Sequence, residues 1–114
     1  KTLSHPASVD SLTTSGGQED LVSMAPWAGQ KLLQIQSNIS NILAIEMIVA
    51  GAANNISSIK LKSGKGTALV LDIIKKSCNF SAGDRTLTNE INVLANHIRS
   101  NYLIEAISKH ITLE

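Results

Sequence analysis

The sequence predicts an all-α fold in which one long helix precedes two or three shorter helices. Apolar residues recur at spacings of three and four over several long stretches, which is typical of helices with one buried face. No segment alternates between apolar and polar residues for long enough to predict a strand. Apolar residues make up 43% of the 114 residues but aromatic residues only 3%, so we expect a core of aliphatic side chains.

The first 19 residues predict a loop that leads into the long helix. Pro6, Gly16 and Gly17 interrupt regular structure, and the Ser, Thr and Asp residues around them favour local hydrogen bonds to the backbone. The loop ends at Glu19 and Asp20. Two interpretations are open, because acidic side chains complement the positive end of a helix, and a polar loop at a helix start can also hold a small molecule.

Residues 20–54 predict the long helix. Polar and apolar side chains fall on opposite faces, with Lys31, Gln34, Asn38 and Asn41 on the first and Leu32, Ile35, Ile39, Ile42 and Val49 on the second. Because proline lacks a backbone N–H, the helix either begins near Ser23, with Pro26 in its first turn, or kinks at Pro26. Asn54 and Asn55 are expected to end it.

The second half of this helix, residues 42–53, is apolar nearly all round, whereas a surface helix keeps a polar face. Glu46 is the exception, and a nearly buried carboxylate requires a partner. We therefore expect the helix to lie at the centre of a larger helical bundle, covered by segments or subunits outside this sequence. The apolar run 39–53 is shorter than a membrane span and contains Asn41, so we expect no membrane partner.

Two further helical segments follow. Residues 67–77 form an apolar face at helical spacing, and Thr67 is a suitable N-cap. Residues 88–110 predict one or two helices, with Thr88 as the cap and a break at Ser100-Asn101.

Composition excludes several classes of function. The net charge of +1 is spread along the chain, so no basic stripe suggests a nucleic acid partner. Cys78 is the single cysteine, so an internal disulfide is excluded and a small buried thiol in a reducing cytoplasm is expected. The three histidines, His5, His97 and His110, are isolated, and no metal site is expected. Residues 1–12 lack the apolar core of a signal peptide, which also favours a cytoplasmic location.

Three groups of residues form a recognisable pattern along the chain. They are Ser8-Val9-Asp10-Ser11, Thr14-Ser15, Gln18-Glu19-Asp20 and Val22-Ser23-Met24-Ala25, then Ile42-Leu43-Ala44-Ile45-Glu46, then Asp84-Arg85 with Leu87, Glu90 and Ile91. The first group, which covers the loop and its junction with the long helix, resembles the C-terminal signature of the aromatic amino acid lyase family, and within it the histidine lyases. The two later groups are looser similarities to the same family in the same order.

The resemblance implies a cofactor, an assembly and a place in a larger chain. Enzymes of this family eliminate ammonia from an amino acid with a methylidene-imidazolone group, which forms from an internal Ala-Ser-Gly. The 114 residues contain no Ala-Ser-Gly, and Thr14-Ser15-Gly16 lies in the context of the C-terminal signature. The resemblance therefore implies that the electrophile lies upstream, that this C-terminal fragment alone is inactive, and that the whole protein is a homotetramer.

The resemblance also assigns the site. Glu19 matches the position at which histidine lyases carry glutamate and phenylalanine or tyrosine lyases carry glutamine, which implies L-histidine as the substrate and Glu19 as the catalytic residue at its ring. Gln18 and Ser15 match neighbouring substrate-binding positions.

Two alternatives stay open. The chain could be a helical oligomerisation or interaction module without chemistry, in which residues 18–20 only cap a helix. It could also belong to a lyase or aminomutase with another amino acid substrate, because Gly17, Leu21 and Pro26-Trp27 depart from the usual residues at those positions.

Overall fold

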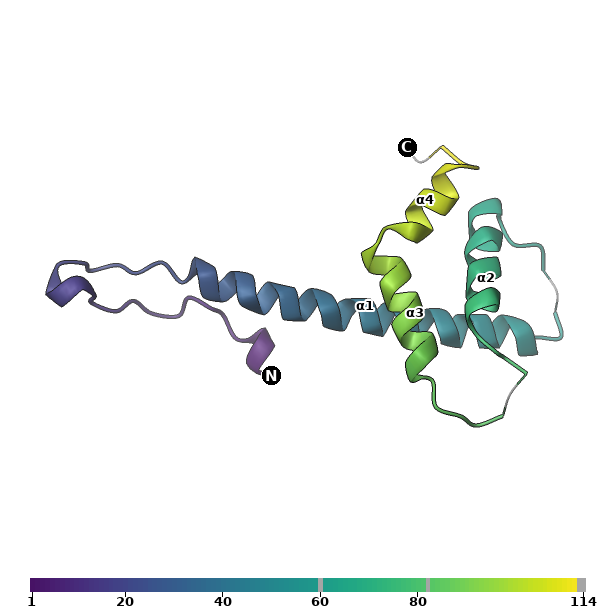
Figure 1. Ribbon diagram of the computed structural model, residues 1–114, viewed down its shortest axis with the longest axis horizontal. Coiled ribbons are helices and arrows are strands. Elements are labelled where there is room, and N and C mark those ends of the chain that lie inside the picture. The colour runs from purple at the N-terminus through teal and green to yellow at the C-terminus, as the bar shows by residue number, and fades with distance from the viewer. Residues whose placement is uncertain (60, 82, 113–114) are drawn as a thin grey trace. The chain divides into compact units, whose positions relative to one another are not determined.

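The computed structural model describes residues 1–59, 61–81 and 83–112, and the chain divides into two units, Lys1–Ile39 and Ser40–Glu114. In chain order it contains the four helices α1, Ala25–Ile56, α2, Lys65–Ser77, α3, Thr88–Arg99, and α4, Tyr102–Ser108 (Figure 1). Two single 3₁₀ turns, Thr2–Ser4 and Ser15–Gly17, precede them. No strand occurs in the described ranges, so the predicted fold class of one long helix followed by three shorter ones is confirmed.

Helix α1 is 32 residues long and begins at Ala25, five residues later than the sequence indicated. Pro26 is its second residue, where the missing N–H has no intrahelical partner to lose and the fixed φ suits the helix. Of the two expected arrangements, the structure has the one with Pro26 in the first turn. The helix continues past Asn54 and Asn55 to Ile56.

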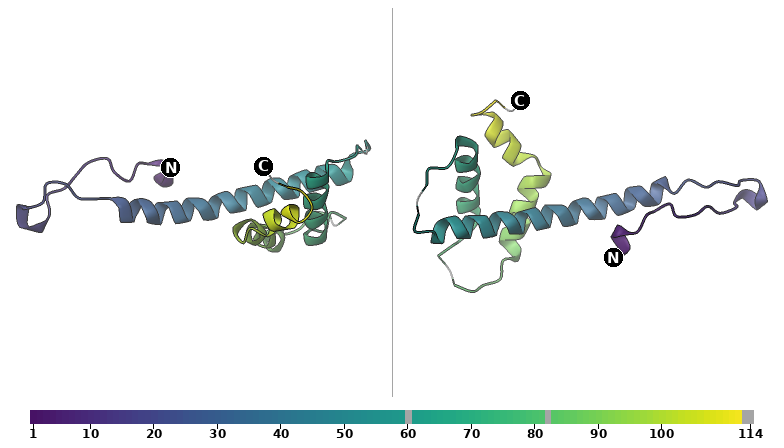
Figure 2. Two further views of the ribbon diagram at one scale, coloured as in Figure 1. Left: turned by 90° about the horizontal axis from the view of Figure 1, so that it is seen from above. Right: turned by 180° about the vertical axis from the view of Figure 1, so that it is seen from behind.

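The core of the second unit is small and aliphatic. One face of α1 contributes Ala44 and Ile48, which form a buried cluster with Ile74 of α2, Cys78 after α2, and Leu94 and Ala95 of α3. Both views of Figure 2 place α2, α3 and α4 on one side of the C-terminal half of α1. Cys78 is buried, as expected for a lone thiol in an aliphatic core.

Gly51 is the point of closest approach between α1 and its neighbours. A Cβ atom added there would lie 2.7 Å from Cζ of Phe80 and 2.8 Å from Cγ2 of Ile74. Both separations are far below van der Waals contact, so only glycine fits without movement of the surrounding side chains.

Two helix starts differ from the sequence predictions. Helix α2 begins at Lys65, because Gly64 serves as the N-cap and its carbonyl accepts the Ala68 N–H at 2.9 Å. Thr88, expected to cap the next helix, is instead its first helical residue, and the cap is Leu87. The carbonyl group of the preceding residue makes the first helical bond in both cases, and neither N-cap makes a side-chain hydrogen bond.

The expected break at Ser100-Asn101 separates α3 from α4. Asn101 adopts the left-handed conformation (φ +59°), which asparagine tolerates better than most residues. Across this turn the rings of His97 and Tyr102 stack with their centroids 4.6 Å apart. The contact joins the end of α3 to the start of α4.

The face of α1 opposite the core remains apolar and uncovered. Ile42 is 56% exposed, Val49 62% and Ile56 81%, and their spacing puts them on one side of the helix. Glu46 on the same side is exposed in this structure. Burial of its carboxylate by segments or subunits outside this sequence stays a prediction, because nothing in the described part of the second unit covers that side.

By length and composition alone, α1 is long and apolar enough to cross a membrane. The uninterrupted apolar run 39–53 is shorter than a span, but the helix begins at Ala25 and ends at Ile56, so most of the added length lies on its N-terminal side. A helix in the core of a larger soluble protein has the same length and composition.

Candidate functional site

The candidate site is a closed hairpin loop within the first unit. Thr14 and Glu19 pair across it, with the Thr14 N–H donating to the Glu19 carbonyl at 3.0 Å and the Glu19 N–H donating to the Thr14 carbonyl at 3.2 Å. The Gly17 N–H also donates to the Thr14 carbonyl, at 3.1 Å. These bonds close a tight turn in which Gly16 and Gly17 are central. The loop is the dark purple segment between the N-terminus and α1 in Figure 1.

Three consecutive residues at the tip have positive φ angles, which are +55° at Ser15, +64° at Gly16 and +88° at Gly17. Glycine adopts this conformation without steric cost, whereas serine does so rarely. A non-glycine residue held in the left-handed region is a form of local strain that is common at functional loops. Ser15 is therefore fixed by the turn on both sides.

The turn brings the three predicted site residues together. Ser15, Gln18 and Glu19 lie within five residues of one another at the tip, and all three are exposed. Within the described residues the Glu19 carboxylate makes no ion pair or side-chain hydrogen bond, so it is available to a ligand. Their assignment to substrate remains a prediction, since the hairpin supplies at most one wall of a pocket.

Ser11 is a member of this loop that the sequence analysis did not single out for a role. Its hydroxyl donates to the Asp20 carbonyl at 3.2 Å and accepts the Val22 N–H at 3.1 Å. The partners are nine and eleven residues away, so no local spacing rule identifies them. The only signal in the sequence was its position in the block that resembles the lyase signature.

The N-terminal arm of the loop returns to the start of α1. The Lys31 ammonium group donates to the carbonyl of His5. A shallow cavity of about 280 Å³ lies beside this contact, between Leu3 on the arm and Trp27 and Gln34 on α1. None of the predicted site residues lines it.

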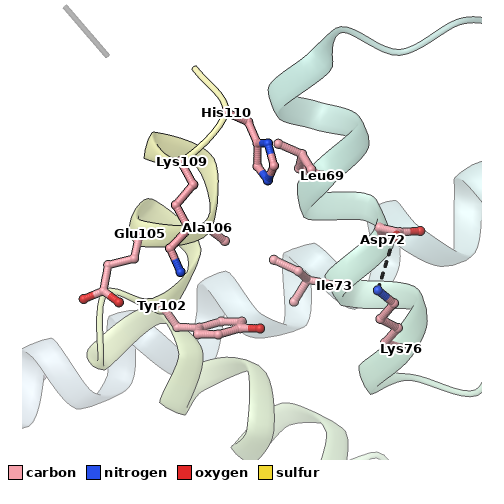
Figure 3. A pocket seen from close by; sticks show the side chains of 9 residues that line it. All are labelled: Leu69, Asp72, Ile73, Lys76, Tyr102, Glu105, Ala106, Lys109 and His110. Atoms are coloured by element: carbon pink, nitrogen blue, oxygen red, sulfur yellow. Dashed lines mark ion pairs between the residues drawn. The ribbon is translucent and has the colours of Figure 1, made fainter. Parts of the chain in front are cut away.

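A second cavity, of about 230 Å³, lies in the other unit between α2 and α4 (Figure 3). Its polar lining is of mixed charge. Helix α2 contributes Asp72 and Lys76, which form an exposed ion pair at 3.4 Å, and the α4 side contributes Tyr102, Glu105, Lys109 and His110. The charges balance, so the cavity favours neither anions nor cations. In the part of the chain that the structure describes, no group of His, Cys, Asp and Glu side chains could hold a metal ion.

The clearest electrostatic feature of the second unit lies before α3. Arg85 donates to both carboxylate oxygens of Glu90, at 2.7 and 2.8 Å, and Glu90 also accepts the Asn79 N–H at 3.1 Å. These hydrogen bonds, chiefly those from Arg85, hold the pKa of Glu90 below its usual value. Burial and then the Glu90 charge raise the pKa of the nearby Cys78 thiol. The pair fixes the connection between α2 and α3, and its role is structural.

Comparison with known proteins places this arrangement in a family. The model of the aromatic amino acid lyase family, "Aromatic amino acid lyase", matches residues 1–76, two thirds of the chain, including the whole hairpin and α1. The chain belongs to the aromatic amino acid lyase family.

Individual members of the family match over nearly the whole chain. The histidine ammonia-lyase of Treponema denticola is 44% identical over 91 residues, which are 80% of this chain and 18% of that protein. The histidine ammonia-lyase of Alkaliphilus oremlandii is 40% identical over 114 residues, 100% of this chain and 22% of that protein. The histidine ammonia-lyase of Caldanaerobacter subterraneus subsp. tengcongensis is 38% identical over 109 residues, which are 96% of this chain and 21% of that protein. This lyase-family chain thus spans about a fifth of the length of these relatives.

Proposed function

We propose that this chain is the C-terminal portion of a histidine ammonia-lyase, which as a whole protein eliminates ammonia from L-histidine to give urocanate. The observation that carries the proposal is the hairpin, which displays the Glu19 carboxylate without a side-chain partner among the described residues, in a chain whose similar relatives are named histidine ammonia-lyase. In this proposal residues 1–19 are a loop of the active site and the helices that follow are its support.

Glu19 is proposed to contact the ring of the substrate. A carboxylate facing a phenyl ring would lose hydration without a compensating bond, whereas the N–H of an imidazole can donate a charge-assisted hydrogen bond to it. This difference favours histidine over phenylalanine or tyrosine as the substrate. In the same position Glu19 could accept or return a proton during the reaction.

Gln18 and Ser15 are proposed to bind the substrate beside Glu19. Both belong to the same turn, whose backbone hydrogen bonds fix their Cα positions relative to Glu19. An amide and a hydroxyl can each donate and accept, so they suit the polar groups of an amino acid.

The family's methylidene-imidazolone group would supply the electrophile for the elimination. The residues of this chain do not fit its formation, because the sequence contains no Ala-Ser-Gly and Thr14-Ser15-Gly16 is used in the hairpin turn. We therefore propose that the 114 residues alone are inactive and contribute only the Glu19 wall of the site.

We propose that the whole protein is a homo-oligomer of the cytoplasm, and the uncovered apolar side of α1 supports the assembly. Ile42, Val49 and Ile56 expose more than half of their surface, and an apolar stripe of this kind marks a protein interface. We favour a bundle core over a membrane span for α1, because its other face carries Lys31, Gln34, Asn38 and Asn41. The chain has no basic stripe that would suggest a nucleic acid partner. The chain alone should self-associate in light scattering, and a monomer at every concentration would contradict this part of the proposal.

The decisive test replaces Glu19 with glutamine in the whole protein. Loss of one charge-assisted hydrogen bond, about 1.5–3 kcal/mol, should lower kcat/KM for histidine by about ten- to a hundredfold. The control is Glu105→Gln, which makes the same chemical change at an exposed carboxylate of α4 and should leave kcat/KM unchanged. Unchanged turnover in the Glu19 variant would remove Glu19 from the site, whereas a whole protein with no turnover of histidine would favour the non-catalytic module.

A further inference from the structure

The hairpin is held by two sets of hydrogen bonds, and Glu19 lies between them. The inner set is the pairing of Thr14 with Glu19 at the turn. The outer set consists of the two bonds of the Ser11 hydroxyl, to the Asp20 carbonyl at 3.2 Å and from the Val22 N–H at 3.1 Å. The first set fixes the backbone of Glu19 from the turn side, and the second fixes the residue that follows it.

Large apolar side chains contribute little to the outer set, because Leu12 and Leu21, next to these bonds, are 57% and 79% exposed. A loop without a buried anchor depends on its hydrogen bonds for a single conformation. If the outer set were lost, the inner pairing would be the one hydrogen-bonded link that the described residues provide between the two arms of the hairpin.

The chemistry of the outer set requires a hydroxyl group. One oxygen atom both donates to a carbonyl and accepts from an N–H, which serine and threonine can do and alanine or valine cannot. Ser11 itself is exposed, so a further methyl group has room at this position.

We propose that Ser11 is a positioning residue for Glu19, which acts on the substrate only by fixing the segment that carries the carboxylate. The inference rests on the proposed function, because it assumes that Glu19 contacts the substrate. A group held within a narrow range of positions loses less freedom on binding and keeps its alignment with the reacting atoms. Loss of the Ser11 hydroxyl should therefore lower turnover through a Glu19 that is present but less well placed.

The test compares Ser11→Thr with Ser11→Val in the whole protein, since these two side chains have nearly the same shape and differ by the hydroxyl. We expect kcat/KM for histidine to stay within about twofold of the parent for Ser11→Thr and to fall about five- to tenfold for Ser11→Val, the effect of about one hydrogen bond. Ser58→Ala is the control, because Ser58 is exposed, lies outside the hairpin and makes no side-chain hydrogen bond within the described residues. Far-ultraviolet circular dichroism should be the same for all variants.

A double-mutant cycle separates positioning from a general structural effect. In the Glu19→Gln background, Ser11→Val should lower kcat/KM by no more than about twofold, because the group that it positions is already impaired. An equal loss in both backgrounds, or no loss in the parent, would overturn the role of Ser11 and leave the proposed function intact. Parent-like turnover of Glu19→Gln alone would overturn the proposed role of Glu19 and the Ser11 inference together.

Discussion

The close approach at Gly51 makes a quantitative prediction about the core of the second unit. Replacement of a helical glycine by alanine stabilises a helix by about 1 kcal/mol when the methyl group has room. At Gly51 the new Cβ would lie 2.8 Å from Cγ2 of Ile74, a buried side chain that is only 3% exposed. Phe80 can move the end of its ring, but Ile74 is branched at Cβ and enclosed, so the core must shift.

The two effects have opposite signs, and the clash should prevail. Overpacking of a core by a methyl group costs about 1–3 kcal/mol, so Gly51→Ala should destabilise the chain by about 1 kcal/mol after the gain in helix propensity. Gly29→Ala is the matched control, because it lies in the same helix with no atom within 4 Å of the added Cβ and should not destabilise the chain. The measurement is urea unfolding followed by circular dichroism.

A third variant identifies the atom responsible. Ile74→Leu keeps the side-chain volume but moves the branch from Cβ to Cγ, so the methyl group nearest to Gly51 is removed. The cost of Gly51→Ala should be smaller in that background. The reasoning would be refuted if Gly51→Ala stabilised the chain as much as Gly29→Ala, or if its cost were the same with leucine at position 74.

Three further predictions concern the second unit. Arg85→Met should lower the free energy of unfolding in urea by about 1 kcal/mol, which lies between the values typical of exposed and of buried ion pairs. Arg85 lowers the pKa of Glu90 in the folded state, so the pair contributes its full stability above the usual carboxyl pKa and loses it as the pH falls through the lowered value. The difference in free energy of unfolding between the parent and Arg85→Met should therefore shrink in acid. A difference that does not change with pH would argue against the pair. The Cys78 thiol is buried and its pKa is raised, so a thiol reagent at neutral pH should modify it slowly in the folded chain and rapidly in urea, and equal rates would exclude a buried thiol. Asn101→Val should cost about 1–2 kcal/mol in thermal unfolding because of its positive φ, whereas Asn101→Gly should not destabilise, and similar effects of the two would contradict the left-handed turn.

The parts of the fold that depend on local spacing could be predicted from the sequence. The helical faces follow from the recurrence of apolar residues at spacings of three and four along the sequence. The low content of aromatic residues predicts the aliphatic core around Ala44 and Leu94. The position of Pro26 limits where α1 can begin. The break at Asn101 follows from the composition of the segment that contains it.

The parts that depend on distant partners could not be predicted. Ile74 lies close to Gly51, and the Ser11 hydroxyl accepts a hydrogen bond from the Val22 N–H. In both pairs the separation along the sequence matches no helix or strand period, so no pattern predicts the contact. Helix α2 begins before Thr67 because Gly64 can cap it with a backbone carbonyl alone. The burial expected for Glu46 requires a larger helical bundle, completed by segments or subunits outside this sequence. The described part of this chain leaves that side of α1 open.

The candidate site, too, could be predicted from the sequence only in part. The residues of the hairpin tip were recognised by their resemblance to a family, and the structure adds the geometry that fixes Ser15 and Glu19 in one turn. The opposite wall of a pocket is not formed by the described residues of the first unit. We propose that a complete site requires chain outside these 114 residues.

The most direct test of that claim is to determine the coding sequence immediately upstream of Lys1. The account predicts an open reading frame continuous with this chain, which encodes an Ala-Ser-Gly tripeptide and further segments of the lyase family. A start codon at or just before Lys1, with no such tripeptide in the same frame, would contradict it. The chain would then be a lyase-like helical module, and its function would be binding or assembly.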